Sequence, residues 1–543
     1  MKKIYQTGFI FLLGLMFLAC IVPSTDTIDK YTVTFNPTGG ALAANDKSRQ
    51  TDKDGRITDL PTPVKAGYDF IEWRTSGNTR ISTNYVFFED TIVFARWSGD
   101  SEEMDDGGII AEIARLKREA QSGGNYEIVI DNTESVSFFL PPQTLDFGAR
   151  NNITITIQSR IQFTNEVDPN TGEYIGWPCI VNLTQRGSVL TIGRGVTLKL
   201  EGVTFNGLDR NTAPMVVINS GGALEMYEGA RIADNIYETD FYMNNRSEAG
   251  GIWVKSGAQL LLDGGQVVNN FAYDGGGVRV DDGGYFEMIK GEISYNQADF
   301  GGGVHLDKGA EFIMHDGGIL NNSAFGGGGV AVWETSTFTM NGGLIQDNSA
   351  EGGGGVFVRG LFTMNDGTIR KCNAGDGGGV FIRYDGTFIM YGGEISENDA
   401  YGGGGVSIQA SPGSFTMFGG VIKDNEATSW GGGVSNDGGY FNMRGGEIMG
   451  NKASYQGGGY SGYFGIFQLE TGIIYGKDAV PPALPNICDN YSDEDAVYIR
   501  KDSGLAFLGT FGGGPNGAFT SKGTLSGKEK TVKAENGVLL EYP

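Results

Sequence analysis

The sequence predicts an all-β protein whose main body is a right-handed parallel β-helix of about 26 residues per coil. Three observations predict this fold. Glycine makes up 90 of the 543 residues, short phrases recur at nearly constant spacing from about residue 198, and the phrases alternate apolar and polar residues, as strands with one buried face do. Because 39% of the residues are hydrophobic, a flexible glycine-rich linker is excluded.

The recurring phrases define the coil. Gly-Gly-Gly-Val recurs at intervals of 24 to 28 residues and is followed by Phe-x-Met, an aliphatic residue five positions later, asparagine and then alanine. Equivalent residues should stack in columns about 4.8 Å apart, with the asparagine amides forming a ladder. A propeller blade would need about 40–45 residues, so we expect a β-helix of at least eleven coils over 125–480. The valines are Val278, Val304, Val330, Val356, Val380, Val406 and Val434, and Cys372 replaces one asparagine of the ladder.

The N-terminus carries an export signal. Lys2 and Lys3 precede an apolar run that ends at Cys20 and is too short to span a membrane. The ending Phe-Leu-Ala-Cys resembles a bacterial lipoprotein lipobox, which implies cleavage after residues 1–20, acylation of Cys20 and a membrane partner through the lipid anchor. A simple signal peptide with an incidental cysteine is the alternative. Residues 21–30 are expected to form a tether.

Residues 31–97 form a separate small β-rich module, with strand-like ends around Gly and Pro turns. This stretch resembles the Listeria–Bacteroides repeat, a family related to internalin B repeats. The resemblance implies a β-rich module of cell-surface proteins without known catalytic residues. We expect Trp73 and Trp97 to be core aromatics. The matching residues are Tyr31 to Phe35, Gly39, Gly40, Pro61, Pro63, Gly67, Tyr68, Phe70 to Trp73 and Ala95 to Trp97.

The segment 98–124 is predicted to be an acidic linker followed by a helix. Ile109, Ile113, Leu116 and Ala120 recur at helical spacing, so the helix should place its apolar stripe over the open edge of the first coil. Residues 481–543 are less repetitive and are expected to form a C-terminal β cap.

The repeat phrases also resemble a known family. Gly-Gly-Gly-Val and Ile-x-x-Asn are similar to the short tandem motifs of chlamydial polymorphic outer membrane proteins, whose passenger domains are β-helical. This resemblance implies a surface-exposed β-helix and brings no catalytic residues with it.

Charge and cysteine content exclude several classes of function. Lys and Arg total 40 against 65 Asp and Glu, a formal charge of -25, so a nucleic-acid partner is not expected. The three cysteines after Cys20 are too few and too far apart for a disulfide framework or a zinc site. His305 and His315 should face different sides of the coil, and neither a metal nor a cofactor is expected.

The columns suggest where ligands would bind. The residue after each valine should face outward, beginning with Arg279 and His305. Two residues further on, a second outward column forms a ridge along the solenoid. We expect Trp333 and two arginines of this ridge to bind ligand. Its two carboxylates should lie about 5 Å apart, a separation that suits a retaining glycosidase. This ridge contains Asp281, Asp307, Trp333, Arg359 and Arg383.

Two functional hypotheses follow. The first is a lipid-anchored protein of the bacterial cell surface or outer membrane, an adhesin or binding scaffold for a host protein or a polysaccharide. The alternative is a glycan-cleaving enzyme, a pectin-lyase-like hydrolase or lyase using Asp281 and Asp307. A purely structural component of a surface layer is a third possibility.

Overall fold

The computed structural model describes most of the chain as two separate compact units. The described residues are 30–97 with short gaps, 108–160 except 133–136, 179–236 except 210, 248–475 except 410–411, and the short segments between 486 and 542. Cys20 and the signal segment lie outside these residues, as does the acidic stretch 98–107.

The N-terminal unit is a five-stranded sheet in the order β2-β1-β5-β3-β4. Trp73 is buried at its centre, where the indole Nε1 donates to the carbonyl oxygen of Pro61 at 2.6 Å and the ring packs edge-on against Phe35. The prediction of a small β module with Trp73 in its core is confirmed. Its elements are β1 (Thr32–Asn36), η1 (Ala44–Asp46), β2 (Ser48–Gln50), β3 (Phe70–Thr75), β4 (Arg80–Ile81) and β5 (Thr91–Trp97).

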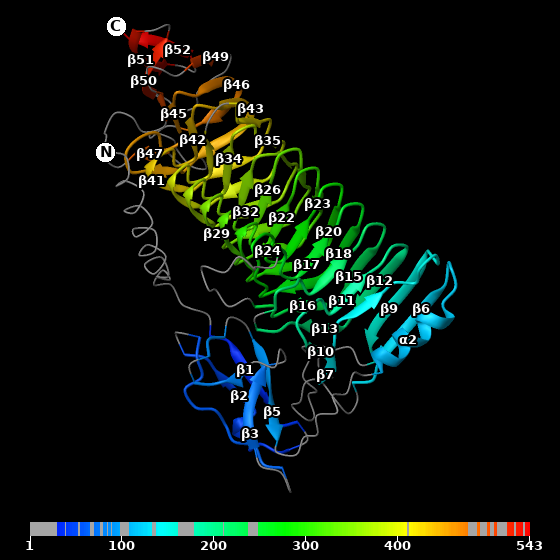
Figure 1. Cartoon of the computed structure of the whole chain (residues 1–543). Helices are drawn as coiled ribbons and strands as arrows, with labels where there is room; N and C mark the ends of the chain where they lie inside the picture. The colour runs from blue at the N-terminus through cyan, green and yellow to red at the C-terminus, as the bar shows by residue number, and fades with distance from the viewer. Residues whose placement is uncertain are drawn as a thin grey trace, which may run out of the picture. The chain divides into compact units, whose positions relative to one another are not determined.

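The second unit is a parallel β-solenoid of about 12 turns with about 26 residues per turn, which confirms the predicted fold class. Figure 1 shows its strands stacked in chain order away from the single described helix, α2. In its described part, three long parallel sheets run along the solenoid. We name them the valine, phenylalanine and alanine sheets after the residue that recurs in each.

Each regular turn visits the three sheets in a fixed order. A Val-x-Val strand is followed by a Phe-x-Met strand and a short strand around an isoleucine, both in the phenylalanine sheet, and then by an alanine strand. The regular turn thus has four strand segments. Some turns join the two middle segments into one longer strand, as in β20 (Tyr285–Ser294).

The valine sheet has thirteen strands in the described part. They are β8 (Gln143–Leu145), β11 (Leu190–Ile192), β14 (Val216–Ile218), β17 (Ile252–Val254), β19 (Val278–Val280), β22 (Val304–Leu306), β26 (Val330–Val332), β30 (Val356–Val358), β34 (Val380–Arg383), β38 (Val406–Gln409), β42 (Val434–Asp437), β45 (Tyr460–Tyr463) and β48 (Val497–Ile499).

The phenylalanine sheet is the largest, and its first strands precede the regular repeats. They are β6 (Asn125–Ile130), β7 (Ser137–Leu140), β9 (Ile153–Ser159), β10 (Cys179–Leu183), β12 (Val196–Glu201), β13 (Val203–Asn206), β15 (Ala223–Tyr227), β16 (Arg231–Ala233), β18 (Gln259–Val268), β20, β23 (Glu311–Met314), β24 (Gly318–Leu320), β27 (Thr337–Met340), β28 (Leu344–Gln346), β31 (Leu361–Met364), β32 (Thr368–Arg370), β35 (Thr387–Met390), β36 (Glu394–Ser396), β39 (Ser414–Met417), β40 (Val421–Lys423), β43 (Tyr440–Met449), β46 (Ile466–Ile474) and β49 (Gly504–Phe507).

Within the described residues, the alanine sheet begins where the repeats become regular. Its described strands are β21 (Gln297–Phe300), β25 (Ser323–Gly326), β29 (Ser349–Gly352), β33 (Asn373–Asp376), β37 (Asp399–Gly402), β41 (Glu426–Trp430), β44 (Lys452–Ala453) and β47 (Ile487–Cys488).

The ends of the solenoid are covered differently. Helix α2 (Ile109–Glu119) buries Ile109, Ile113 and Leu116 in the same core cluster as the first strands, so it covers the first turn as the sequence predicts. At the other end, β47, β48 and β49 each pair with the preceding turn. A further turn therefore occupies part of the range 481–543 that the sequence assigned to a cap. The three antiparallel strands β50 (Phe519–Leu525), β51 (Lys528–Glu535) and β52 (Val538–Tyr542) follow it.

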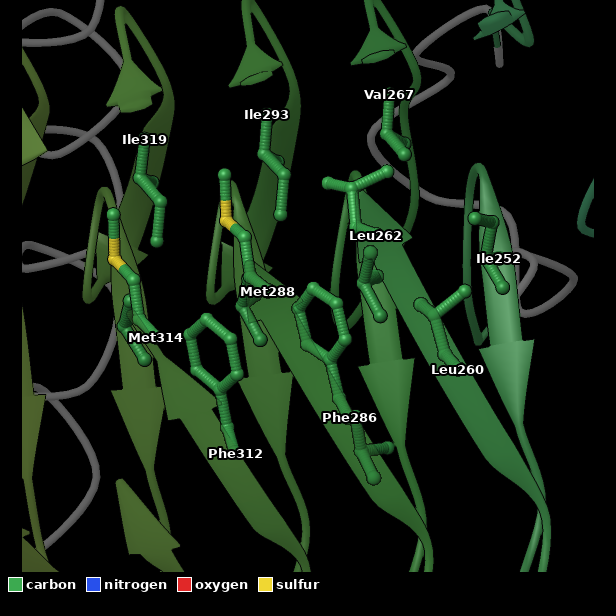
Figure 2. Close-up of a cluster of buried hydrophobic side chains, with 14 of the residues drawn as sticks. Ile252, Leu260, Leu262, Val267, Phe286, Met288, Ile293, Phe312, Met314 and Ile319 are labelled. Atoms are coloured by element: carbon green, nitrogen blue, oxygen red, sulfur yellow. The ribbon is translucent and has the colours of Figure 1, made fainter. Parts of the chain in front are cut away.

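The interior is a set of columns. The rings of Phe286 and Phe312 stack with centroids 4.4 Å apart and planes within 3°, and the same contact recurs in the following turns. Figure 2 shows the column of Met288 and Met314 beside these rings and the isoleucine column beyond it. All these side chains are fully buried, so the hydrophobic effect acts on every turn equally.

Each methionine of the Phe-x-Met strands packs against a glycine of the next turn. Gly393 has a φ of +84°, and a Cβ there would lie 2.6 Å from the Met364 Cε methyl and from a backbone oxygen of the preceding turn. Glycine adopts this backbone conformation without strain and leaves space for the methionine. The constant spacing of methionine and glycine from repeat to repeat in the sequence thus reflects one packing contact.

The asparagine ladder forms as the sequence predicts. Asn322 illustrates its pattern: Nδ2 donates to Oδ1 of Asn348 in the next turn at 3.1 Å and to the carbonyl oxygen of Ile293 at 2.9 Å. Its Oδ1 accepts the backbone N–H and the side-chain amide of Asn296. Each buried amide is therefore satisfied within the ladder, which a buried polar group requires.

Between Val304 and Val406 the turns differ in length at one corner. The turn from Val356 to Val380 is two residues shorter than its predecessor. The two missing residues come from the connection between the valine and phenylalanine sheets. Residues 333–336 connect β26 to β27, whereas only residues 359–360 connect β30 to β31. The asparagine corner keeps its register, since Ile345 still pairs with Ile369 and Ala350 with Ala374.

We expect Gly393→Ala to destabilise the solenoid by about 3 kcal/mol, because the methyl group is strained and is blocked by both the Gly367 backbone oxygen and the Met364 methyl group. The matched control is Gly123→Ala. Gly123 has a φ of +78° but open space around its would-be Cβ, so only the strain of about 1 kcal/mol remains. Urea unfolding followed by circular dichroism measures both variants. Equal losses would contradict the methionine contact.

Cys372 interrupts the ladder, and restoring asparagine should stabilise the protein. Asn348 Nδ2 donates to the carbonyl oxygen of Ile319 at 2.8 Å, but towards the next turn it meets the Cys372 sulfur, at 3.9 Å, where Asn322 meets an amide oxygen. We expect Cys372→Asn to raise the free energy of unfolding by about 1 kcal/mol, since it adds hydrogen bonds between buried groups. Asn398→Ala is the opposite control and should lower it. Thermal unfolding tests both, and a destabilised Cys372→Asn variant would show that this corner cannot hold the amide.

Candidate functional site

The residues of the predicted ridge lie on successive turns, at the C-terminal ends of the strands of the valine sheet. The backbone N–H groups of Asp281, Asp307, Trp333 and Arg359 donate to the strand of the preceding turn at 2.7–3.1 Å. Arg383 ends β34 and pairs with Gln409 of the next turn. The structure therefore brings all five residues into one row along the solenoid.

The column directly after the valines is largely buried, which corrects the expectation that it is exposed. Ala331, Phe357 and Phe381 are buried although they lie outside the interior core cluster. The outward faces of the valine and alanine sheets meet here. A Cβ on Gly326 would lie 2.8 Å from the Phe300 ring and 3.8 Å from Phe357. We call this contact between the two outward faces the outer seam.

The outer seam fits large side chains of one sheet against small residues of the other. Where the alanine sheet has Gly352, the valine sheet has Phe357 and Phe381, and a Cβ on Gly352 would lie 2.6 Å from the Phe381 ring. The alternation of residues along a strand predicts which side of the sheet a residue faces, but it does not reveal that a second sheet covers that side.

Arg279 is the centre of an ion-pair cluster at the start of this seam. Its side chain is 11% exposed, and it contacts Asp281 through Nε at 3.0 Å, Asp274 through Nη1 at 2.9 Å and Asp307 through Nη2 at 3.1 Å. Trp253 Nε1 also donates to Asp281 at 2.8 Å. Both carboxylates of the hypothetical catalytic pair are thus bound to one guanidinium.

Burial shifts the titration of two further groups in this cluster. Burial raises the pKa of Asp274 to about 6, although Arg279 opposes the shift. Burial, reinforced by the positive charge of Arg279, lowers the pKa of His305 to about 3. His305 Nδ1 lies 3.8 Å from Asp274 Oδ1, and neither atom has a hydrogen-bond partner. At neutral pH the histidine is uncharged.

This arrangement favours packing over acid–base catalysis. A retaining glycosidase needs one carboxyl group to donate a proton and the other to attack the sugar. Here the carboxylate oxygens of Asp281 and Asp307 both accept hydrogen bonds from Arg279, so both are engaged by a side chain of the protein itself. The guanidinium thus bridges the two carboxylates.

The three residues predicted to bind ligand take part in a cation–π stack. The Arg359 guanidinium lies 4.3 Å from the centre of the Trp333 ring and 4.8 Å from that of the Tyr384 ring. The Arg383 guanidinium lies 5.0 Å from the centre of the same Tyr384 ring. Arg359 also forms an ion pair with Glu334. Much of the ring surface and charge in this row is therefore already used within the protein.

Sequence reasoning missed several members of these clusters. Asp274 lies at the end of a different strand segment from Arg279, in the alanine-sheet column of Phe300, so spacing within the valine column did not point to it. Tyr384 follows Arg383 directly in the sequence, and this adjacent pair of arginine and tyrosine could have indicated a cation–π contact. Trp253 is one turn before Arg279 in the same column.

The described residues hold no group of three or more His, Cys, Asp or Glu side chains suited to a metal ion. His305 lies in the outer seam, whereas His315 lies beside the phenylalanine sheet with its Nε2 3.1 Å from Glu287. Cys179, Cys372 and Cys488 are buried free thiols.

Comparison with known proteins identifies one module. Residues 31–96 match the family model of the Listeria-Bacteroides repeat domain, so the chain contains such a repeat. No curated protein and no solved structure matches the chain. Within the described residues, no helix has the length and hydrophobicity needed to cross a bilayer.

We expect Arg279→Gln to destabilise the solenoid by about 3 kcal/mol, because it leaves three carboxylates close together without their shared positive charge. The matched control is Arg115→Gln on helix α2, where an exposed guanidinium also binds two carboxylates. This control should change little, since exposed ion pairs contribute weakly. Urea unfolding at pH 7 measures both, and similar losses would contradict the central role of Arg279.

Proposed function

We propose that the chain is a lipid-anchored protein of the bacterial cell surface that acts as a non-catalytic binding scaffold through the outer faces of its solenoid. The observation that carries this proposal is the state of the hypothetical catalytic pair. Asp281 and Asp307 are bound to Arg279, which favours a structural role for them. The solenoid instead offers extended, regular surfaces.

Exposed aromatic side chains support a binding role. They concentrate in the C-terminal turns, where most of the exposed large hydrophobic residues of the described chain lie. Aromatic side chains offer a large contact area at low conformational entropy. The exposed residues of this region are Tyr384, Tyr391, Tyr401, Phe418, Trp430, Tyr440, Tyr455, Tyr463, Phe464 and Ile466.

The location rests on the sequence. The lipobox-like ending at Cys20 supports an acylated N-terminus, and the Listeria-Bacteroides repeat at residues 31–96 is typical of surface proteins. A host protein or a polysaccharide is the ligand class that such a location offers. The outer membrane is the expected site of the anchor.

The test combines location with activity. We expect mass spectrometry of the membrane fraction to find acylated Cys20 as the mature N-terminus, and Cys20→Ala to release the protein from membranes. We further expect the intact protein to bind a glycan or matrix-protein array and to release no reducing ends from acidic or neutral glycans.

Two results would contradict the proposal. An unmodified N-terminus in the culture medium would remove the anchor. Reducing-end release that disappears in Asp281→Asn or Asp307→Asn would establish the glycan-cleaving alternative instead.

A further inference from the structure

The phenylalanine sheet carries an uncharged face over four consecutive turns. It consists of the outward side chains of β27, β31, β35 and β39 and the residue that follows each strand. Pairing places them in three straight columns. None of them is fully buried. We call this set the neutral face: Thr337, Thr339, Asn341, Leu361, Thr363, Asn365, Thr387, Ile389, Tyr391, Ser414, Thr416 and Phe418.

The absence of charge is confined to these three columns, because the same turns carry Asp366 beside Asn365 and an ion pair between Glu394 and Lys423 in the neighbouring columns of the sheet. In the turn before, the corresponding columns hold Glu311 and His315, and His315 contacts Glu287. In the turn after, Arg444 follows the strand and forms an ion pair with Glu470 at 3.0 Å. The chain as a whole carries a formal charge of -25. The neutral face thus differs from the surface on both sides of it.

The chemistry of the face is that of hydroxyl, amide and aromatic groups. Ser414 Oγ donates to Thr387 Oγ1 at 3.3 Å, and Asn365 Nδ2 donates to Asn341 Oδ1 at 2.8 Å. Tyr391 and Phe418 are 51% and 39% exposed and stack with centroids 5.0 Å apart. Hydroxyls and amides both donate and accept hydrogen bonds, so this surface suits a ligand rich in hydroxyl groups.

The geometry of the face repeats once per turn. Neighbouring strands of a sheet lie about 4.8 Å apart, and the stacked core beneath holds the columns rigid. This spacing is close to the length of one sugar unit in an extended polysaccharide. A chain laid along a column would therefore meet an equivalent hydroxyl, amide or aromatic side chain at each sugar.

Charge decides between ligand classes. An anionic polymer would be repelled by the net charge of the protein, and a cationic one would be drawn to the acidic surface elsewhere. A neutral ligand loses nothing on a face without ion pairs. We propose that the neutral face binds an extended neutral polysaccharide along the solenoid axis, an inference that rests on the proposed scaffold function.

The experiment measures binding of the full chain to insoluble cellulose and chitin and to soluble xylan and mannan, with polygalacturonate as the anionic comparison. We expect binding to at least one neutral polymer that does not weaken at high salt, because screening affects only charged contacts. The double variant Tyr391→Ala/Phe418→Ala should weaken it about tenfold or more, equivalent to about 1.4 kcal/mol.

Two controls keep the result specific. Tyr401→Ala removes an aromatic side chain that is 55% exposed in the alanine sheet and should leave affinity within about twofold of the original value. Thr363→Lys places a charge in the centre of the neutral face and should weaken binding without removing an aromatic. Unchanged unfolding curves for the variants show that the fold is retained.

The outcomes separate the inference from the proposed function. Neutral binding that survives both neutral-face changes, or binding only to polygalacturonate or to a protein, overturns the inference and leaves the scaffold function standing. Self-association lost in the double variant, without polysaccharide binding, assigns the face to a second copy of the chain and also overturns it. No binding to any polymer or protein array overturns both.

Discussion

Every turn of this solenoid must accept an identical backbone directly above and below it. The third glycine of each Gly-Gly-Gly corner makes the requirement concrete. A Cβ on Gly329 would lie 2.6 Å from the carbonyl oxygen of Gly355 and 3.3 Å from the Asn348 amide. Any larger residue would push the turns apart at the corner and break the ladders of backbone hydrogen bonds on both sides of it.

This constraint explains the composition of the core. Once the turns are fixed at one strand spacing, equivalent side chains meet one another, so the sequence must supply residues that pack well against copies of themselves. Flat phenylalanine rings stack face to face, asparagine amides donate and accept in the same direction, and methionine extends into the space above a glycine. Stability is then distributed as a sum of similar turn-to-turn contacts.

The sequence predicted the features that depend on contacts between equivalent residues of successive turns. The columns of Phe312 and Met314, the asparagine ladder and the apolar stripe of the capping helix were all predicted, because a fixed period converts position into contact. The burial of Phe357 and the pairing of Asp274 with Arg279 were not, because they arise where two different sheets meet. The turn formed by β47 to β49 escaped prediction because its residues depart from the repeat phrases.

The corner between the valine and phenylalanine sheets has a further consequence. Its length changes from 333–336 to 359–360 without moving the strands or the asparagine corner. The other two corners are held by glycine contacts and by the amide ladder. Between Val304 and Val406 this edge alone changes length, so it is where a foreign peptide or epitope could be grafted so that several copies are displayed in a row.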